Sequence, residues 1–271
     1  MSADPMPGAG HDDLVPPAFT LPVGGLPRTG PPTVDLAVPR TAVAVGAHPD
    51  DVDFGCGGTL AKWAAAGCHT HHVVLTDGSK GTWDADADPA ELVATRQEEQ
   101  RRAADILGSR SVTFLGAVDG ELLPGRDELR RLCRVVRRLR PDVVIGHDPW
   151  RRYRLHPDHR HAGFLTVDAV VAARDPGFFP ELPEPPHRPR CLLLFEPDSV
   201  NHVEDIGGVI DRKVDALLAH RSQHLTTMGI ADGAGDGAGD AFAAAVSRQA
   251  AEHGAVAGLG AGEAFHRIDD L

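Results

Sequence analysis

Short apolar runs alternate with longer amphipathic segments along the chain from residue 41 onward. A run of roughly four to eight apolar or β-branched residues that ends in a turn is typical of a buried strand, whereas apolar residues spaced about three or four apart over a longer stretch indicate a helix. These patterns predict strands over residues 41–46, 70–75, 111–115, 142–147 and 191–196. They predict helices over about 57–66, 90–107, 127–139, 158–173 and 207–220.

This alternation of strands and helices predicts an α/β fold. Helices of that length connect parallel strands and pack on both faces of the sheet. We therefore expect a single Rossmann-like domain, with a mostly parallel sheet and helices on both faces. A chain of 271 residues is long enough for one large domain of this class and does not require two.

Two segments lack a periodic apolar pattern. Residues 1–39 hold nine prolines and several glycines, which predicts an extended or partly disordered arm ahead of a domain that spans residues 40–271. Residues 229–240 consist mostly of glycine, alanine and aspartate, a composition typical of a flexible surface loop.

Composition restricts the partners and the compartment. The formal net charge of -12 argues against nucleic acid or an anionic membrane surface as a partner, because polyanion binding needs a basic surface. No apolar run is long enough to cross a membrane, and the N-terminus lacks the basic and apolar regions of a secretory signal. The cysteines lack CxxC spacing, which predicts reduced thiols in a cytoplasmic protein. They are Cys56, Cys68, Cys133 and Cys191.

A cluster of potential metal ligands follows the first predicted strand. His48, Asp50 and Asp51 lie directly behind it, and the residues past the carboxyl end of a parallel strand are where open α/β sheets place their chemistry. His48 and Asp51 are three residues apart, so in a turn that leads into a helix both can point to one side. Asp50 then points elsewhere and is free to act as a general base towards a water molecule.

A second cluster follows the fourth predicted strand and contains His156 and His159. Loops that follow neighbouring strands of a parallel sheet lie within side-chain reach of each other. His48, Asp51 and His159 would then form a His/Asp/His set with one position left open, which suits a catalytic zinc ion. His156 would lie opposite Asp50, where it could stabilise a developing oxyanion or protonate a leaving amine.

A chance origin and a nucleotide-binding site are the main alternatives for these motifs. A chain with fifteen histidines places some of them near carboxylates by chance. However, two His-Pro-Asp tripeptides that each follow an apolar strand are hard to explain by turn formation alone. The glycines within residues 55–58 lack the GxGxxG spacing of a dinucleotide-binding loop. A metal site is therefore the favoured interpretation.

The two motifs together resemble those of a known family. His48-Pro49-Asp50-Asp51 and the later His156-Pro157-Asp158-His159 are similar to the signature motifs of the PIG-L (LmbE-like) family of zinc-dependent N-acetylglucosaminyl deacetylases. The resemblance extends over about residues 41–267. It includes the segments 55–60, 75–82, 96–99, 114–116, 119–120, 205–206, 213–217, 220–223 and 263–265.

This resemblance implies both an activity and a ligand set. The activity would be a metal-dependent hydrolysis that removes the N-acetyl group from an N-acetylglucosamine-type amino sugar or glycoconjugate and releases acetate. By resemblance, His48, Asp51 and His159 bind zinc and Asp50 is the general base. The same ligand set also accepts Fe(II).

Further roles follow from the resemblance. His156 would be the electrostatic stabiliser or general acid, oriented by Asp158. Arg96 is similar to the family's substrate-gripping arginine, and Asp119 is expected to hydrogen-bond sugar hydroxyls. The alternative for Arg96 is an i,i+3 ion pair with Glu99 on an exposed helix.

Two positions depart from the family pattern. Many members carry Glu directly after the two aspartates, where this chain has Val52 followed by Asp53. This variant resembles the bacillithiol-pathway branch more than the mycothiol-pathway branch. Some members also carry a Tyr two residues before the histidine of the second motif, where this chain has Arg154 beside its single tyrosine, Tyr153. Either Tyr153 serves the oxyanion site from a shifted loop, or Arg154 does so without it.

Two other functions remain open from the sequence. One is an amidase of the same fold that acts on thiol-sugar conjugates, and the other is a non-catalytic sugar-binding module. Asp50 and His156 argue against the second, because binding alone does not need a spare base. We expect a small-molecule amino-sugar substrate, and the resemblance leaves a homo-oligomer open because family members commonly assemble.

Overall fold

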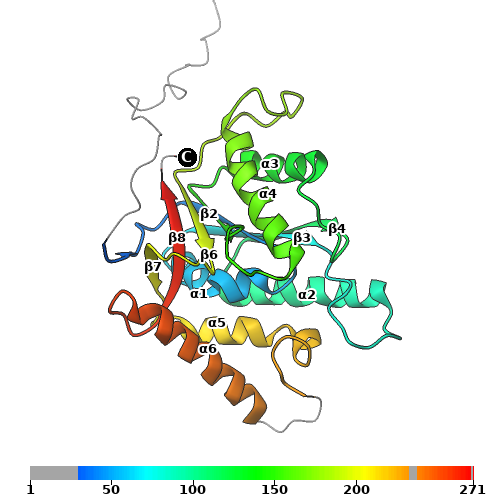
Figure 1. The fold of residues 1–271 in the computed structure, drawn as a ribbon, viewed down its shortest axis with the longest axis vertical. Helices are drawn as coiled ribbons and strands as arrows, with labels where there is room; N and C mark the ends of the chain where they lie inside the picture. The colour runs from blue at the N-terminus through cyan, green and yellow to red at the C-terminus, as the bar shows by residue number, and fades with distance from the viewer. Residues whose placement is uncertain (1–29, 232–236, 270) are drawn as a thin grey trace, which may run out of the picture. The chain divides into compact units, whose positions relative to one another are not determined.

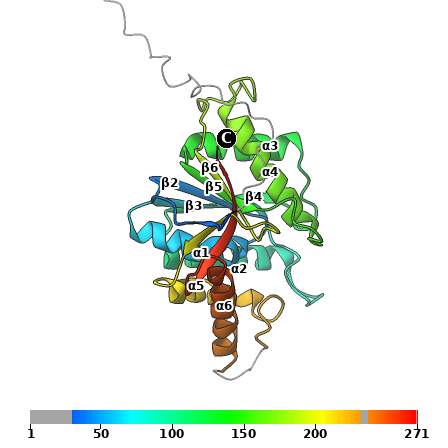
Figure 2. The same cartoon turned by 60° about the vertical axis from the view of Figure 1, so that its left-hand side comes forward.

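A computed structural model describes residues 30–231, 237–269 and 271. The chain from Pro31 onward forms one compact unit, in which a central sheet lies between two layers of helices (Figures 1 and 2). The strands are β1 (Thr33–Val34), β2 (Thr41–Gly46), β3 (His69–Thr76), β4 (Ser111–Ala117), β5 (Val143–His147), β6 (Cys191–Phe195), β7 (His202–Asp205) and β8 (Gly262–Asp269). The helices are α1 (Asp51–Ala65), α2 (Pro89–Leu107), α3 (Arg126–Leu139), α4 (Pro157–Arg174), α5 (Ile210–Leu218), the 3-10 turn η2 (Arg221–Gln223) and α6 (Gly237–Ala255).

The strand order of the sheet is β1-β7-β8-β6-β5-β2-β3-β4. All neighbouring strands are parallel except β8, which runs antiparallel to both β6 and β7. The chain passes outward from β2 to β3 and β4, and then returns to place β5 on the other side of β2. Such a reversal opens a crevice at the carboxyl ends of the two strands, where open α/β sheets bind their ligands.

The two faces of β2 enter different parts of the core. Ala42 and Ala44 pack in one buried cluster with Trp63 of α1, whereas Val43 and Val45 pack in another with residues of α3 and α4. Helices α1, α2 and α5 therefore cover one face of the sheet, and α3 and α4 cover the other (Figure 1). This period-2 division explains why the strand reads as a continuous apolar run.

The five predicted strands and five predicted helices are present, but α1 begins earlier than predicted. It starts at Asp51 and is bent at Cys56, whose φ of -151° and ψ of 18° are not helical. Gly55 and Gly58 flank this bend because a Cβ atom would lie 2.6 Å from the Phe195 ring at the first position and 2.9 Å from Ile206 at the second. The glycines interrupted the apolar period in the sequence, so only the second part of the helix was predictable.

Five elements were not predicted, and two of them, β1 and α6, correct the domain boundaries. β1 lies inside the predicted arm, because its backbone forms a parallel ladder with β7, while residues 1–29 of that arm lie outside the described residues. The flexible loop was predicted over residues 229–240, but α6 already starts at Gly237, so the last four residues of that prediction are helical. Residues 232–236 of the predicted loop lie outside the described residues. The alanine-rich sequence that follows has high helix propensity and extends the helix back into the glycine-rich segment.

In the described part of the chain, no helix is long and apolar enough to cross a membrane.

Candidate active site

The loops that follow β2 and β5 meet at one cavity of about 480 Å³. They meet because β2 and β5 are paired in parallel, so their carboxyl ends lie at the same edge of the sheet. The cavity is lined by both predicted clusters together with side chains from neighbouring loops. From the two clusters come His48, Asp50, Asp51, His147, His156 and His159.

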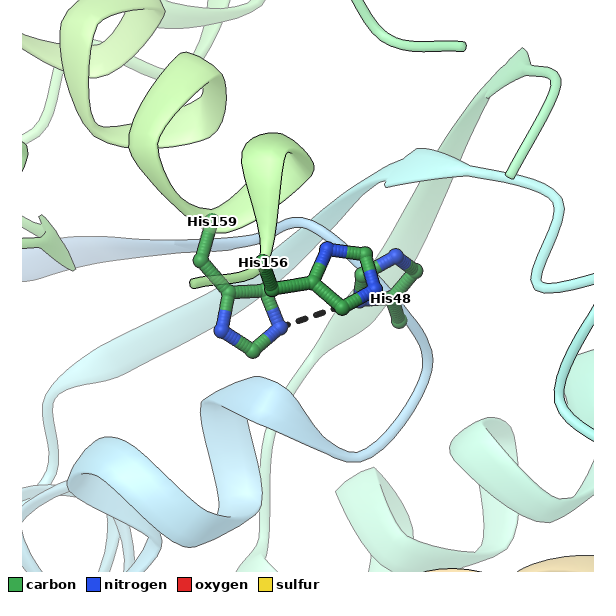
Figure 3. Close-up of side chains that lie close together, drawn as sticks. All are labelled: His48, His156 and His159. Carbon is green, nitrogen blue, oxygen red and sulfur yellow. Dashed lines mark hydrogen bonds between the residues drawn. The ribbon is translucent and has the colours of Figure 1, made fainter. Parts of the chain in front are cut away.

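Three of these side chains converge as a metal-binding set would. His48 Nδ1 lies 3.2 Å from His159 Nε2 and 3.3 Å from an Asp51 oxygen, and His159 Nε2 lies 3.2 Å from the other Asp51 oxygen. Figure 3 shows His159 and His156 descending from the start of α4 towards His48. Bonds of about 2.0–2.1 Å from zinc to its ligands place two tetrahedral ligand atoms about 3.3 Å apart. The donor types and their spacing therefore fit a zinc ion.

Neighbouring side chains widen the choice of ligands. His156 joins His48 and His159 in one potential metal-binding group, and His147 joins Asp51 and His159 in another. His147 Nε2 lies 3.3 Å from Asp51, and its ring stacks on the His159 ring at a centroid distance of 4.5 Å. All these groups share the same cavity, so the chain carries a concentrated set of candidate metal-binding residues.

Two carboxylates hold the ring of His48 from behind. Its Nε2 lies 3.1 Å from Asp119 and 3.2 Å from Asp158. Burial lowers the pKa of His48, but hydrogen bonds to Asp119, Asp158 and Asp51 outweigh burial and hold that pKa well above its usual value. A carboxylate that accepts the far N–H of a histidine fixes its tautomer and leaves the near nitrogen free for a metal.

This contact corrects one sequence prediction and redirects another. Asp158 was expected to orient His156, but its carboxylate accepts the backbone N–H of Gly120 at 2.6 Å and faces His48. Asp119, which was expected to bind sugar hydroxyls, also faces His48 and accepts the backbone N–H of Lys80 at 3.1 Å. Its role in sugar binding stays a prediction. One carboxylate oxygen of Asp119 already faces His48, and the other already accepts from the Lys80 backbone.

We expect Asp158→Asn to weaken metal binding by about 10- to 100-fold, the usual effect of removing a partner behind a metal-binding histidine. The amide cannot stabilise positive charge on His48 as a carboxylate does. Competition with a chromophoric chelator measures the change. Asp168→Asn, an exposed carboxylate on the same helix, serves as the matched control. Equal metal affinity in the two variants would contradict this role of Asp158.

Asp50 lies at the entrance of α1 in an unusual backbone conformation. Its φ of 97° is rare for a residue with a side chain. Its backbone N–H donates to the Gln100 side-chain oxygen at 2.8 Å, deep in the protein. Burial raises the pKa of the Asp50 carboxyl to about 6, against the opposing charge of Arg96.

Arg96 is buried rather than exposed, so the predicted alternative of a surface ion pair is wrong. Its guanidinium donates to the carbonyl oxygens of Gly78 and Pro49, both at 2.8 Å. Glu99 instead accepts hydrogen bonds from the backbone N–H and the hydroxyl of Ser222. Arg96 lines the cavity, and its predicted contact with substrate stays a prediction. Its two hydrogen bonds to backbone carbonyls hold the two loops that shape the cavity.

The residues around the second motif divide between the cavity and the surface. His156 lines the mouth of the cavity and stacks on His159 at a centroid distance of 4.7 Å. Arg154 lies with a guanidinium nitrogen 3.1 Å from His159 Nδ1 and pairs with Glu196. Tyr153 is 86% exposed and lies outside the cavity lining. The structure therefore does not bring Tyr153 to the predicted oxyanion site.

Comparisons with known proteins agree with this geometry. The family profile described as PIG-L: GlcNAc-PI de-N-acetylase matches residues 43–170. The diacetylchitobiose deacetylase of Thermococcus kodakarensis is 36% identical over 187 residues, which cover 68% of this chain and 70% of that protein. The chain belongs to the PIG-L family. The predicted family and the enzyme class, a deacetylase that hydrolyses an amide bond, are confirmed.

Structural similarity places the fold in the same family. The N,N'-diacetylchitobiose deacetylase of Pyrococcus horikoshii superposes with a TM-score of 0.77 at 29% identity, over 85% of this chain and 84% of that one. The predicted Rossmann-like fold is thereby confirmed. The 4-oxalmesaconate hydratase of Pseudomonas putida is also similar, with 31% identity over 66% of this chain and 72% of that protein. The proteins similar to this chain therefore include one that is named for a different reaction.

Several residues around the PIG-L site received no role from the sequence. His147 stands at the start of the second cluster without an assigned role, and it ends β5 and is 1% exposed. Glu196 follows β6 at the same edge. Their position directly after parallel strands was the available signal. Gln223 comes from η2, within the segment 220–223 that resembles the family, but the resemblance assigned it no role. Val52, at the position where many members have Glu, is buried in the core. Asp53 accepts a hydrogen bond from the Gln100 side chain.

The raised pKa of Asp50 predicts an acid limit to activity. In the predicted role of general base Asp50 must be ionised, and its carboxyl is protonated as the pH falls through its pKa of about 6. A bound cation beside Asp50 favours the ionised form and moves this limit to lower pH. We therefore expect kcat/KM to fall at or below about pH 6. A pH profile of kcat/KM for the metal-loaded enzyme measures it, and a limit well above pH 6 would assign the base elsewhere.

Proposed function

We propose that this chain is a zinc-dependent deacetylase that hydrolyses the acetamide of an N-acetylglucosamine-type sugar or glycoconjugate. One observation carries the proposal most directly: a buried carboxylate with a raised pKa, Asp50, adjoins three converging potential ligand atoms. A site for binding alone needs the ligands but not the carboxylate.

In this proposal His48, Asp51 and His159 hold the metal. Two imidazole nitrogens with one carboxylate favour Zn²⁺ and also suit Fe(II), so the choice of zinc belongs to the proposal. When bound there, the ion supplies Lewis-acid chemistry to the amide carbonyl and lowers the pKa of water. Asp119 and Asp158 keep His48 in the orientation that binding requires.

Asp50 and His156 then share the remaining chemistry. Asp50 takes a proton from the water that attacks the acetamide carbon and returns it to the amine nitrogen as the C–N bond breaks, so that acetate and a free amine result. Burial and the nearby His48 lower the pKa of His156. A neutral ring suits hydrogen-bond donation to the developing oxyanion better than it suits storage of a proton.

The cavity wall supports an amino sugar as the substrate. Phe54 and Phe195 offer aromatic surface, and Lys80, Gln223 and Thr227 offer polar groups on the same lining. Sugars present both apolar ring faces and hydroxyls, so such a mixture suits them. The thiol-sugar amidase has less support, since the relatives described above include two diacetylchitobiose deacetylases. A cytoplasmic location and a homo-oligomer remain predictions from the sequence.

Acetate release from a panel of N-acetylated sugars tests the proposed function. The panel contains N-acetylglucosamine, diacetylchitobiose and N-acetylglucosaminyl glycosides, each incubated with enzyme that is metal-free or loaded with Zn²⁺ or Fe(II). We expect acetate only from metal-loaded enzyme. A separate incubation with 4-oxalmesaconate tests the alternative, because its hydration without acetate release from any sugar would favour the reaction for which the Pseudomonas putida relative is named. Sugar binding without either product would favour a binding module.

A further inference from the structure

A chain of buried polar side chains runs behind the Asp50 backbone. Gln100 on α2 accepts the Asp50 N–H at 2.8 Å and donates to an Asp53 oxygen at 2.8 Å. That oxygen also receives a hydrogen bond from His220 Nε2 at 2.9 Å. A second donor of Gln100 faces His72 Nδ1 at 3.3 Å. Gln100, Asp53, His72 and His220 are each fully buried.

The contacts allow only one orientation of the Gln100 amide. Its oxygen must face the Asp50 N–H, which can only donate, and its NH₂ group must face the Asp53 carboxylate, which accepts. A flipped amide would place its NH₂ group against the Asp50 N–H, so that two donors meet. It would also place its oxygen against the Asp53 carboxylate, so that two acceptors meet. Asp53 and His220 therefore set the direction in which Gln100 presents its oxygen to Asp50.

The Asp50 backbone needs this partner for two reasons. A φ of 97° is costly for a residue with a Cβ and persists only where the surrounding structure holds it. The N–H is also buried, and a buried donor without an acceptor costs free energy. The conformation aims the Asp50 carboxylate into the cavity, while Asp51 directly after it joins the potential metal ligands.

We propose that Gln100 is a positioning residue for the deacetylation step, which fixes the backbone of Asp50 and thereby the direction of its carboxylate. Asp53 and His220 act one step further away by orienting Gln100. This inference rests on the proposed function, in which Asp50 is the base. The side chains of Gln100, Asp53 and His220 do not line the cavity. The inference therefore assigns a catalytic purpose to residues that lie behind the cavity wall.

The first test replaces the hydrogen-bonding group at constant side-chain size. In Gln100→Met the Asp50 N–H loses its acceptor, and we expect kcat to fall by about 10- to 100-fold, as for other supporting residues of catalytic centres. KM and metal content should stay close to wild type, because no group that binds substrate or metal is changed. Gln97→Met is the matched control, since it makes the same change three residues earlier on α2, outside the network.

A second variant restores the hydrogen bonds with exchanged groups. Gln100→Glu combined with Asp53→Asn keeps an oxygen for the Asp50 N–H and leaves the total charge unchanged. The new amide at position 53 donates to the new carboxylate and to His220 Nε2, which accepts when His220 carries its proton on Nδ1. Gln100→Glu alone sets two carboxylates against each other. We expect the double variant to recover most of the kcat that either single variant loses. A purely structural contribution of this buried region would not produce such a reciprocal rescue.

Hydrogen exchange at the Asp50 amide gives a readout that does not depend on activity. We expect slow exchange in the wild type and in Gln97→Met, and fast exchange at this amide in Gln100→Met, measured by NMR on folded, metal-loaded protein. Unchanged exchange or unchanged kcat in Gln100→Met would overturn the inference. If the wild type releases no acetate from any N-acetyl sugar, the proposed function fails. The exchange measurement still decides whether Gln100 holds Asp50.

Discussion

Asp50→Asn should lower kcat by about 10²- to 10⁴-fold, the range that a positioned general base contributes, while the protein keeps its metal. The amide has the size of the carboxylate but cannot take a proton from water. Asn is preferable to Ala here because it tolerates a positive φ better than most residues, and Asp50 has a φ of 97°. The change therefore removes the base with little effect on the local backbone.

Three measurements separate this loss from simple damage to the site. Metal content by atomic spectroscopy and the midpoint of thermal unfolding should match the wild type, because the potential ligands His48, Asp51 and His159 are untouched. Asp105→Asn, which changes an exposed carboxylate on α2, should leave kcat unchanged. Full activity in metal-loaded Asp50→Asn would show that another group takes the proton.

The local parts of this site could be predicted from the sequence. The first His-Pro-Asp motif directly follows the buried strand β2, and the second comes after β5 at the start of α4. Parallel pairing of β2 with β5 then brings His48 and His159 together. The strands themselves were predictable because burial on both faces makes them continuous apolar runs. The prediction that Asp50 is a spare carboxylate rests on spacing alone, and the burial and raised pKa of Asp50 are consistent with it.

Contacts between distant segments could not be predicted in the same way. Asp158 is two residues from His156, yet it faces His48, which is 110 residues earlier in the chain. Gln100 reads as one more polar position on an amphipathic helix, although it lies behind the Asp50 backbone. Only the packing of α2 against α1 decides which polar residue of that helix is buried. The short β1 was missed because its two residues are held by backbone bonds to β7 rather than by a pattern of side chains.

The largest effect on metal binding is expected from His159→Ala. We expect it to weaken metal binding by more than about 100-fold, beyond the 10- to 100-fold of a supporting residue, because it removes one of the three proposed ligands. His159 is the preferable position for this test. Removal of His48 would also leave Asp119 and Asp158 facing each other without their shared partner, which adds a folding defect to the loss of a ligand. His69→Ala, an exposed histidine at the start of β3, controls for the loss of an imidazole.

The same variant separates the proposed ligand set from its neighbours. His147 and His156 lie close enough to enter other potential groups, and both of those groups contain His159. His156→Ala should therefore keep full metal stoichiometry and lose turnover, whereas His159→Ala should lose both. If His159→Ala retains a full equivalent of zinc, the ion is held by other residues, and the group of His48 with Asp119 and Asp158 becomes the alternative site. If His156→Ala loses zinc as well, His156 is a ligand, and the oxyanion must be stabilised by another residue of the cavity.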